Sequence, residues 1–404
     1  MTLLDARMSF TTFRATMALA VVFVMLATTG WTAVRPHGPA DARSVAVRAW
    51  LRATVGGHRL PDPDTAPAGA VARLFSSLSR PQALRLTRRY PLVVGNLNGV
   101  PLALRYQANR YALLKARADE RRRAVSNALT PAGRKDAGRR ANRYTSLLAG
   151  HRQILAFDPS GAGRAAEVLG DLGTATRVAI VVPGVDTNIL SFERTTKAYA
   201  APVGMARALY RREKAAEPDA RTAVIAWADY VTPSGVGLDA STANLAEHGA
   251  TRLLALLGTL PRWQRVTLFC HSYGSVLCGV AAPDLAKGQV TDITVFGSPG
   301  MHVKRASQLH TDANVWAARD SDDWIEDVPH LEFAGLGHGT DPVSGKFGAR
   351  VVSARGAAGH PGYFAPGTAS LGNFVDIALG RYAAVICDGS PDAGQDADCT
   401  SGLV

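Results

Sequence analysis

The chain has 404 residues, enough for one large domain or two, and its 47% apolar against 19% charged residues excludes a disordered polar protein. Lys and Arg number 45 against 33 Asp and Glu, but only seven of the 45 are Lys. Such an Arg- and Ala-rich composition is weak evidence for a nucleic-acid partner, and we expect none. Four Cys exclude a disulfide scaffold, and because none stand in a C-x-x-C pair we expect no structural zinc site.

The positive charge is concentrated in the first part of the chain. Residues 1–150 carry 24 Lys and Arg against 7 Asp and Glu, a net charge of +17. Residues 151–404 carry 21 against 26, a net charge of −5. This asymmetry predicts a boundary near residue 150 between a basic and a mildly acidic region.

An uncharged apolar stretch runs from Ala15 to Val34 and follows Arg7 and Arg14. A stretch of about 20 such residues spans a hydrocarbon layer of ~30 Å, so a membrane segment is favoured over a buried core helix. The preceding Arg residues would leave the rest of the chain outside the cytoplasm. We predict a signal-anchor over residues 1–36, with a cleaved signal peptide as the alternative. The protein is then expected to be extracytoplasmic, either anchored or secreted.

Two further segments precede residue 150. Residues 37–69 are rich in Pro, Gly and Ala, which predicts a flexible tether with one short helix near 45–53. Residues 70–150 are predicted to be a basic helical region, with a hairpin of helices at about 103–128 and 131–149. Its Arg and Lys side chains form either a solvated helix face or a surface for an anionic membrane or envelope polymer. Aromatic residues are too sparse among them to suggest base stacking.

Short apolar runs alternate with helical patterns from residue 151 to 386. This alternation predicts an α/β fold, with a mostly parallel sheet covered by helices on both faces. Ligands of such sheets bind at the carboxyl ends of the strands. The predicted strands are 178–182, 222–227, 266–269, 293–296, 315–318 and 349–353, and the predicted helices are about 192–212, 241–258 and 274–282.

The strand 266–269 runs into the sequence CHSYGS, which places Ser272 between a strand and a small-residue helix. A Ser on such a sharp turn projects its hydroxyl above the sheet, and small neighbours relieve the crowding, so the usual pattern is G-x-S-x-G. Cys270 stands here at the place of the first Gly. The pattern predicts that Ser272 is a nucleophile.

A Ser nucleophile needs a base, and the base needs a carboxylate, in the chain order Ser, acid, His. Asp323 follows the strand 315–318 and suits the acid, with Asp320 and Asp322 as near alternatives. His360 follows the last predicted strand and suits the base. His330 and His338 precede that strand and are expected to be ordinary loop residues.

The oxyanion of an acyl transfer needs backbone donors that are held in place. We expect the N–H of Tyr273, at the start of the helix, and that of Val185, where the neighbouring Gly184 allows close approach. Alternatively, Asp186 and Asn188 in the same loop steer the substrate, or the loop is a plain connection.

The four cysteines are expected to differ in role. Cys387 and Cys399 flank a turn-rich loop at the start of the C-terminal tail, residues 387–404, and we predict that they form a disulfide. Free thiols are the alternative. Cys270 and Cys278 are expected to be small buried apolar residues.

Several motifs together resemble a known family. Seven motifs in the same order resemble those of actinobacterial α/β-hydrolases catalogued as a domain of unknown function, over about residues 75–385. This resemblance implies an α/β-hydrolase core with an added N-terminal helical region, and it supports Ser272, Asp323 and His360 as nucleophile, acid and base. The family more often has Gly where this chain has Cys270. The motifs are LVVGNLNGVP, RYQANR, LAFDPSGAGRAAEVLGDLGTATRVAIVVPGVDT, CHSYGS, FGSPG, VWAARDSDDWI and GHPGYF.

The sequence therefore predicts a serine hydrolase that cleaves a small ester or related acyl substrate and needs no metal or organic cofactor. The alternatives are an amidase or thioesterase on the same scaffold, or a non-catalytic envelope-associated binding protein. An epoxide hydrolase is disfavoured because its nucleophile is an Asp. Only 18 residues separate the strand ending at Phe296 from the one starting at Val315, too few for a large lid. The missing lid motivates the hypothesis that the basic hairpin covers the site instead.

Overall fold

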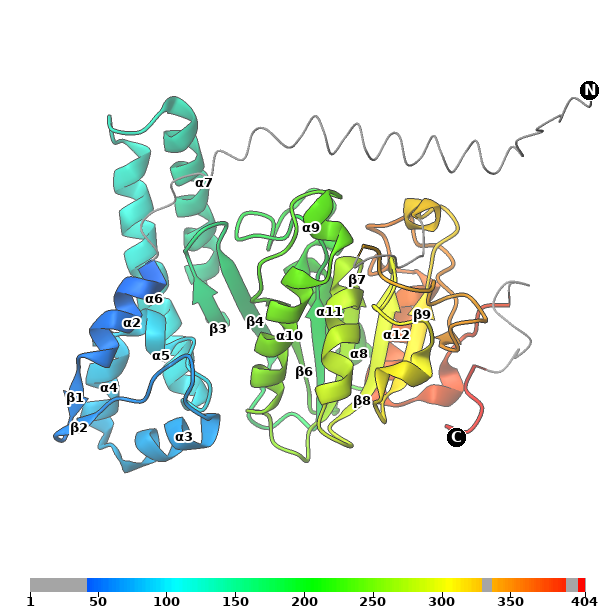
Figure 1. Ribbon diagram of the computed structural model, residues 1–404, viewed down its shortest axis with the longest axis horizontal. Coiled ribbons are helices and arrows are strands. Elements are labelled where there is room, and N and C mark those ends of the chain that lie inside the picture. Colours follow the sequence, from blue (N-terminus) through cyan, green and yellow to red (C-terminus); the bar gives the residue numbers. More distant parts are fainter. Residues whose placement is uncertain (1–41, 329–335, 390–398, 404) are drawn as a thin grey trace, which may run out of the picture.

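A single sheet runs through the part of the chain after residue 150 (Figure 1). The computed structural model of the protein describes residues 42–328, 336–389 and 399–403. Among these residues, the strand order is β10-β9-β8-β7-β5-β6-β4-β3. The six strands from β10 to β6 in this order are parallel to their neighbours. At the other edge, β4 is antiparallel to β6 and β3 is antiparallel to β4. The strands are β3 (Gln153–Asp158), β4 (Arg164–Gly170), β5 (Arg177–Val182), β6 (Thr222–Ala228), β7 (Arg265–His271), β8 (Val290–Phe296), β9 (Asn314–Ala318) and β10 (Arg350–Val351).

Helices cover both faces of the sheet, as the apolar strands predict. Successive side chains of a strand point to opposite faces, so β5 contributes Val178, Ile180 and Val182 to one core and Ala179 and Val181 to the other. The first core lies under α10 and α11, which stand in front of the sheet in Figure 1, and the second lies under α8 and α12. These helices are α8 (Pro202–Ala216), α10 (Asn244–Leu257), α11 (Tyr273–Ala281) and α12 (Ala369–Leu379), with the short α9 (Leu238–Ser241) before α10.

Three parts of this domain differ from the sequence prediction. The strands β3 and β4 were not predicted; in β4 the apolar run is interrupted by Glu167, which pairs with Arg152. The helix predicted at 192–212 begins only at Pro202, whose fixed φ favours the first helical position. A loop and the short 3-10 helix η1 (Ala198–Ala200) precede it. The helix α12 was also not predicted.

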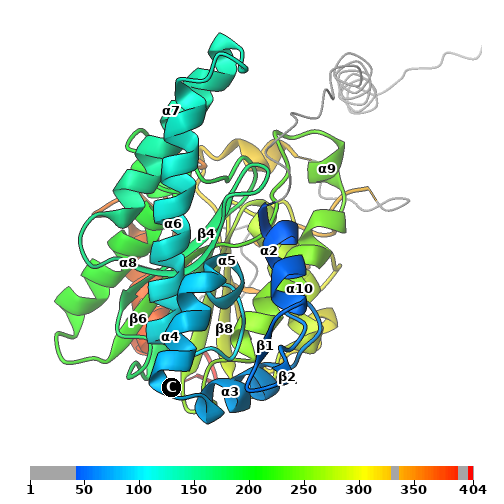
Figure 2. The ribbon, with the colours of Figure 1, turned by 90° about the vertical axis from the view of Figure 1, so that its left-hand side faces the viewer.

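The residues before 150 form a helical region with a core of its own. The predicted hairpin is present: α6 and α7 lie side by side in Figure 2, and α6 packs on β3. Thr130 caps α7 by accepting the Gly133 N–H, and Pro131 occupies the first helical position. The helices are α2 (Ala42–Leu51), α3 (Ala68–Ser77), α4 (Arg80–Arg89), α5 (Pro91–Val94), α6 (Leu102–Ala124) and α7 (Pro131–Leu148).

The segment predicted as a flexible tether is folded from residue 42 onward. The helix α2 and the hairpin of β1 (Thr54–Val55) and β2 (His58–Arg59) occupy it. Trp50 is fully buried, packs edge-on against Tyr90 at 5.5 Å and donates its indole N–H to the Pro61 carbonyl at 2.7 Å. Burying an indole gains enough apolar contact to order a Pro- and Gly-rich stretch.

Several basic residues of the hairpin face the protein rather than solvent. Arg140 is buried, donates to the carbonyls of Pro159 and Gly161, and lies 3.4 Å from the Glu120 carboxylate. Arg123 also binds Glu120, at 2.8 Å. Part of the positive charge therefore joins α6 and α7 to the β3–β4 turn.

The predicted membrane segment, residues 15–34, lies outside the described residues. Among the residues that the structure describes, no helix is both long and apolar enough to cross a membrane.

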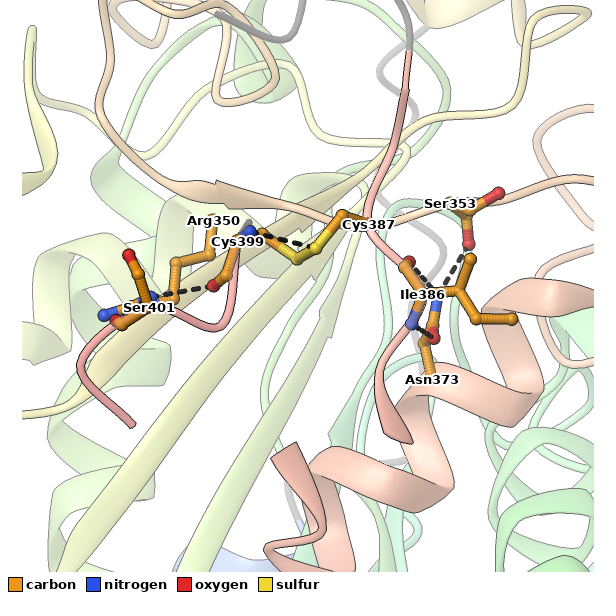
Figure 3. The surroundings of a disulfide bond; sticks show 7 residues. All are labelled: Arg350, Ser353, Asn373, Ile386, Cys387, Cys399 and Ser401. Carbon is orange, nitrogen blue, oxygen red and sulfur yellow. Dashed lines mark hydrogen bonds between the residues drawn. A yellow bond between two sulfur atoms is a disulfide. The ribbon is translucent and has the colours of Figure 1, made fainter. Parts of the chain in front are cut away.

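The predicted Cys387–Cys399 disulfide is present and lies beside β10, the outermost strand of the sheet (Figure 3). The chain near Cys387 pairs with this edge: Ser353 N–H donates to the Ile386 carbonyl at 2.9 Å. Asn373 on α12 donates to the same carbonyl, at 2.9 Å. On the other side, Arg350 donates to the Cys399 carbonyl at 2.7 Å. The disulfide and these bonds cover an edge that would otherwise offer unpaired backbone groups.

Replacing Cys387 and Cys399 together with Ala should lower the free energy of unfolding by about 3 kcal/mol, because the closed loop restricts the unfolded chain. Urea unfolding of the oxidised wild type and the double variant measures the difference. Each single variant also lacks the bond and should lose a similar amount, so differences among the three variants report the lost side-chain packing. Equal stability of wild type and double variant would contradict a structural role for this disulfide.

Candidate active site

Ser272 lies on a strained turn between β7 and α11. Its φ of 53° and ψ of −127° are rare for a residue with a side chain, and they turn the chain sharply from strand to helix. The Ser272 N–H donates to the Phe296 carbonyl at 3.1 Å, which holds the turn against β8. The turn thus has the geometry that the CHSYGS sequence predicts.

Glycines make room for this turn. A Cβ on Gly184 would stand 2.6 Å from the Ser272 Cβ, and one on Gly274 would stand 2.6 Å from the Val182 carbonyl oxygen. Real Cβ atoms do not approach so closely, so any larger residue at either position would displace the turn. The loop after β5 and the start of α11 therefore pack directly around Ser272.

The prediction that Cys270 and Cys278 are unpaired apolar residues is wrong, because they form a disulfide. Cys270 is the second-last residue of β7, and Cys278 lies in the second turn of α11. The sharp turn at Ser272 folds the helix back on the strand and brings the two Cα atoms within 6.5 Å. Spacing along the sequence does not reveal this proximity, which depends on the turn.

The buried Asp323 pairs with His360, which is partly exposed. His360 Nδ1 lies 2.9 Å from Asp323 Oδ1 and 3.1 Å from Oδ2, and the Tyr363 hydroxyl donates to Oδ2 at 2.6 Å. Burial alone would raise the pKa of the Asp323 carboxyl, but the hydrogen bond and charge of His360, with donors from Tyr363 and the Ile325 N–H, lower it. The carboxylate is therefore kept ionised where it contacts the imidazole.

A glycine also makes room for this pair. Gly297 has a φ of +53°, and a Cβ there would lie 2.9 Å from Asp323 Oδ2 and 3.0 Å from His360 Nδ1. Because Gly297 of the FGSPG motif has no side chain, Asp323 and His360 can come into contact there.

The alternative acids and bases have other positions. Asp320 is buried, but its Oδ1 accepts the Gly359 N–H at 2.9 Å and so fixes the loop that carries His360. Asp322 is exposed. The His338 Nε2–H donates to the Ala240 carbonyl at 2.6 Å, away from the Asp323–His360 pair. His330 lies outside the described residues.

His271 is a site residue that the sequence reasoning missed. It precedes Ser272, packs against the rings of Phe296 and His360 at 5.1 and 4.6 Å, and donates from Nε2 to the His360 carbonyl at 3.0 Å. Burial, and then repulsion by His360, lowers the pKa of His271 to about 3, so its ring is neutral. In the sequence, only its position directly before Ser272 could have indicated that His271 belongs to the site.

Ser272 and His360 line the same cavity, with a volume of about 210 Å³. The cavity is also lined by Val185, and the Val185 N–H has no acceptor among the described residues. The Tyr273 N–H is at the free amino end of α11. The Ser272 hydroxyl forms no hydrogen bond within the described residues. Catalytic hydrogen bonds are often long before substrate binds.

The loop after β5 forms much of the cavity wall. Asp186 lines it, and its Oδ1 accepts the Gly235 N–H at 2.8 Å. Asn188 instead shapes the loop, because its Oδ1 accepts the Leu190 and Ser191 N–H groups. The expectation that the basic hairpin covers the site is wrong for this cavity, since none of its lining residues falls within 70–150. The hairpin packs on β3, at the far edge of the sheet from β7.

A family model described as alpha/beta hydrolase matches residues 158–333. The resemblance to the α/β-hydrolase family is confirmed over this segment. An uncharacterised protein of Mycobacterium tuberculosis (strain H37Rv) is 28% identical over 390 residues, covering 82% of this chain and 58% of the relative. The chain thus spans less than two thirds of that relative. An uncharacterised protein of Mycobacterium bovis is 31% identical over 158 residues, covering 36% of this chain and 55% of the relative.

Solved structures with the α/β-hydrolase description are more distant in sequence. A protein of unknown function from Agrobacterium tumefaciens, described as an α/β hydrolase, has 10% identity and a TM-score of 0.33, covering 58% of this chain and 98% of its own. A Xanthomonas campestris α/β serine hydrolase without a lid has 13% identity and a TM-score of 0.30, covering 59% and 97%.

The buried His271 predicts a dependence of stability on pH. Its folded-state pKa of about 3 lies below the unfolded value of 6.5, so the unfolded chain binds the proton first as the pH falls. Stability should therefore be lost progressively between pH 6.5 and 3. From pH 6.5 to 5 the expected loss is about 1.6 kcal/mol in the free energy of unfolding.

Urea unfolding at pH 6.5 and 5 tests this dependence. The variant His271→Gln should lose less stability over the interval than wild type, because no titrating ring remains. The variant His248→Gln, at an exposed position on α10, is the control and should behave as wild type. An unchanged pH dependence in His271→Gln would show that other groups cause the loss.

Proposed function

We propose that this α/β-hydrolase is a serine hydrolase that cleaves an ester or related acyl bond, with Ser272 as nucleophile, His360 as base and Asp323 as acid. The observation that carries the proposal is one cavity that holds both a Ser on a strained strand-to-helix turn and a His bound to a buried carboxylate. Each of these three residues comes after a different parallel strand, β7, β9 or β10, at the carboxyl edge of the sheet.

The proposed reaction has two acyl-transfer steps. His360 Nε2 takes the Ser272 hydroxyl proton as Oγ attacks the acyl carbon, and the N–H groups of Tyr273 and Val185 stabilise the oxyanion. Collapse of the tetrahedral intermediate breaks the bond to the leaving group, which receives the proton from His360. Water then loses a proton to His360 and attacks the acyl carbon, and the second intermediate collapses as His360 returns that proton to Ser272 Oγ, which releases the acid and restores the hydroxyl. The Asp323 carboxylate stabilises the imidazolium in both steps.

The order of this site also depends on residues beside the proposed nucleophile, base and acid. The Tyr363 hydroxyl donates to Asp323 and accepts the Asp320 N–H at 3.0 Å, so it fixes the acid loop to the loop that carries His360. The neutral His271 binds the His360 backbone and fixes the ring beside Ser272. We propose positioning roles for Tyr363 and His271.

We also propose that the enzyme works outside the cytoplasm, anchored by or released from its N-terminal apolar segment. Two disulfides support this location, because disulfides persist in oxidising compartments. The outward-facing cations of the basic hairpin would suit an anionic envelope surface.

A fluorophosphonate probe tests the nucleophile. Wild type should be labelled covalently, and Ser272→Ala should lose both labelling and ester hydrolysis, because no hydroxyl remains on the turn. Ser191→Ala is the matched control, since Ser191 lines the same cavity but lies in the β5–α8 loop, and it should still be labelled. Absence of labelling in folded wild type would refute a serine hydrolase and favour a binding protein.

The variant Gly297→Ala tests the Asp323–His360 pair. Its methyl group would force the two side chains apart, and a displacement of about 1 Å costs on the order of 100-fold in rate. Steady-state hydrolysis of a 4-nitrophenyl ester measures the loss. The control is Gly56→Ala, which has a similar φ of +57° but no atom within 4 Å of the new Cβ. Comparable activity of the two variants would contradict the role assigned to this space.

A further inference from the structure

Two cations line the cavity that contains Ser272. Arg194 and Lys197 both come from the loop between β5 and α8. Neither forms an ion pair with a carboxylate of the described residues. The adjacent Glu193 is already bound by Arg143, Arg152 and Arg207. The cavity thus holds positive charge that the described protein does not neutralise.

Arg194 is the more informative of the two. Its Nε is buried and has no hydrogen-bond partner, and its guanidinium forms no hydrogen bond with any described residue. A buried N–H without an acceptor destabilises the folded protein, so such a group needs another reason to be there. Arg194 lines the same cavity as His271 and Ser272, so its guanidinium is near the nucleophile turn.

The rest of the lining leaves this charge in excess. Asp186 is the carboxylate of the cavity wall, and one of its oxygens is occupied by the Gly235 N–H. His271 is neutral. The remaining wall beside His360 includes the half-exposed Trp324 and Pro361, which offer apolar contact.

We infer that Arg194, with Lys197 at its side, makes the cavity selective for esters that carry an anionic group, a carboxylate or a phosphate, near the scissile bond. The inference rests on the proposed role of Ser272. The planar guanidinium can donate two parallel hydrogen bonds to such an anion, and Lys197 adds a second charge. The volume of about 210 Å³ limits the enclosed part of the substrate to a short chain. Trp324 and Pro361 would contact its apolar part.

The test compares each charged ester with its neutral methyl ester. One pair is 4-nitrophenyl hydrogen adipate and its distal methyl ester, with the carboxylate on the acyl side. The other is 4-carboxyphenyl butyrate and its methyl ester, with the carboxylate on the leaving group. Inorganic phosphate, tested as a competitive inhibitor of neutral ester hydrolysis, reports whether phosphate also binds Arg194. The readout is the ratio of kcat/KM for the charged to the neutral ester, which cancels a general loss of active enzyme.

Wild type should favour the charged ester of at least one pair by about 10- to 100-fold, the range expected of hydrogen bonds to a charged group. Arg194→Gln should reduce this ratio to near 1 and weaken any inhibition by phosphate, whereas Arg194→Lys should retain part of the preference. The control Arg212→Gln removes an exposed cation of α8 outside the cavity and should keep the wild-type ratio.

Two results would overturn the inference while leaving the proposed function intact. One is hydrolysis of charged and neutral esters at equal kcat/KM in wild type, and the other is a preference that survives Arg194→Gln. If wild type hydrolyses no ester and takes no fluorophosphonate label, the proposed function fails, and the inference fails with it. The urea unfolding curve of each variant verifies that it is folded.

Discussion

The close packing around Ser272 is the constraint on which the rest of the site depends. A residue with a side chain adopts a positive φ there, and the neighbouring backbone must approach to distances that only Gly184 and Gly274 permit. The same turn folds α11 back on β7, which allows the Cys270–Cys278 disulfide to link strand and helix. The strain is thus held by parallel strands on both sides and by a covalent bond, rather than by the turn residues alone.

The second half of the site is a network that fixes two loops to each other. Asp323 binds His360 and Tyr363, and Asp320 binds the Gly359 N–H, so the loop after β9 and the loop after β10 share several hydrogen bonds. All of them lie in a poorly solvated region, where a satisfied network is rigid and an unsatisfied group is costly. Arg194 differs from this network, because its buried Nε has no hydrogen-bond partner among the described residues and its side chain lines the cavity that a substrate would enter.

The uneven charge of the chain has a structural use as well as an electrostatic one. Arg140 donates to the carbonyls of Pro159 and Gly161, and Arg143 binds Glu193, so cations of the helical region join it to the domain that contains the sheet. The net charge of +17 in residues 1–150 therefore overstates what is free to bind a partner. The charge that bears on the proposed chemistry lies instead in the acidic half, at Arg194.

The sequence by itself determined the parallel sheet, the turn at Ser272, the hairpin of α6 and α7 and the Cys387–Cys399 disulfide. These depend on local patterns: apolar runs, small residues beside a Ser, a Thr-Pro helix start and a turn-rich loop. The Cys270–Cys278 disulfide, the contacts of His271 and the ordered segment around Trp50 follow only from the tertiary structure. The same holds for the position of the basic hairpin, which does not line the cavity. Each of these needs residues from different elements to meet, and the distance between them is set by packing, which spacing along one chain does not contain.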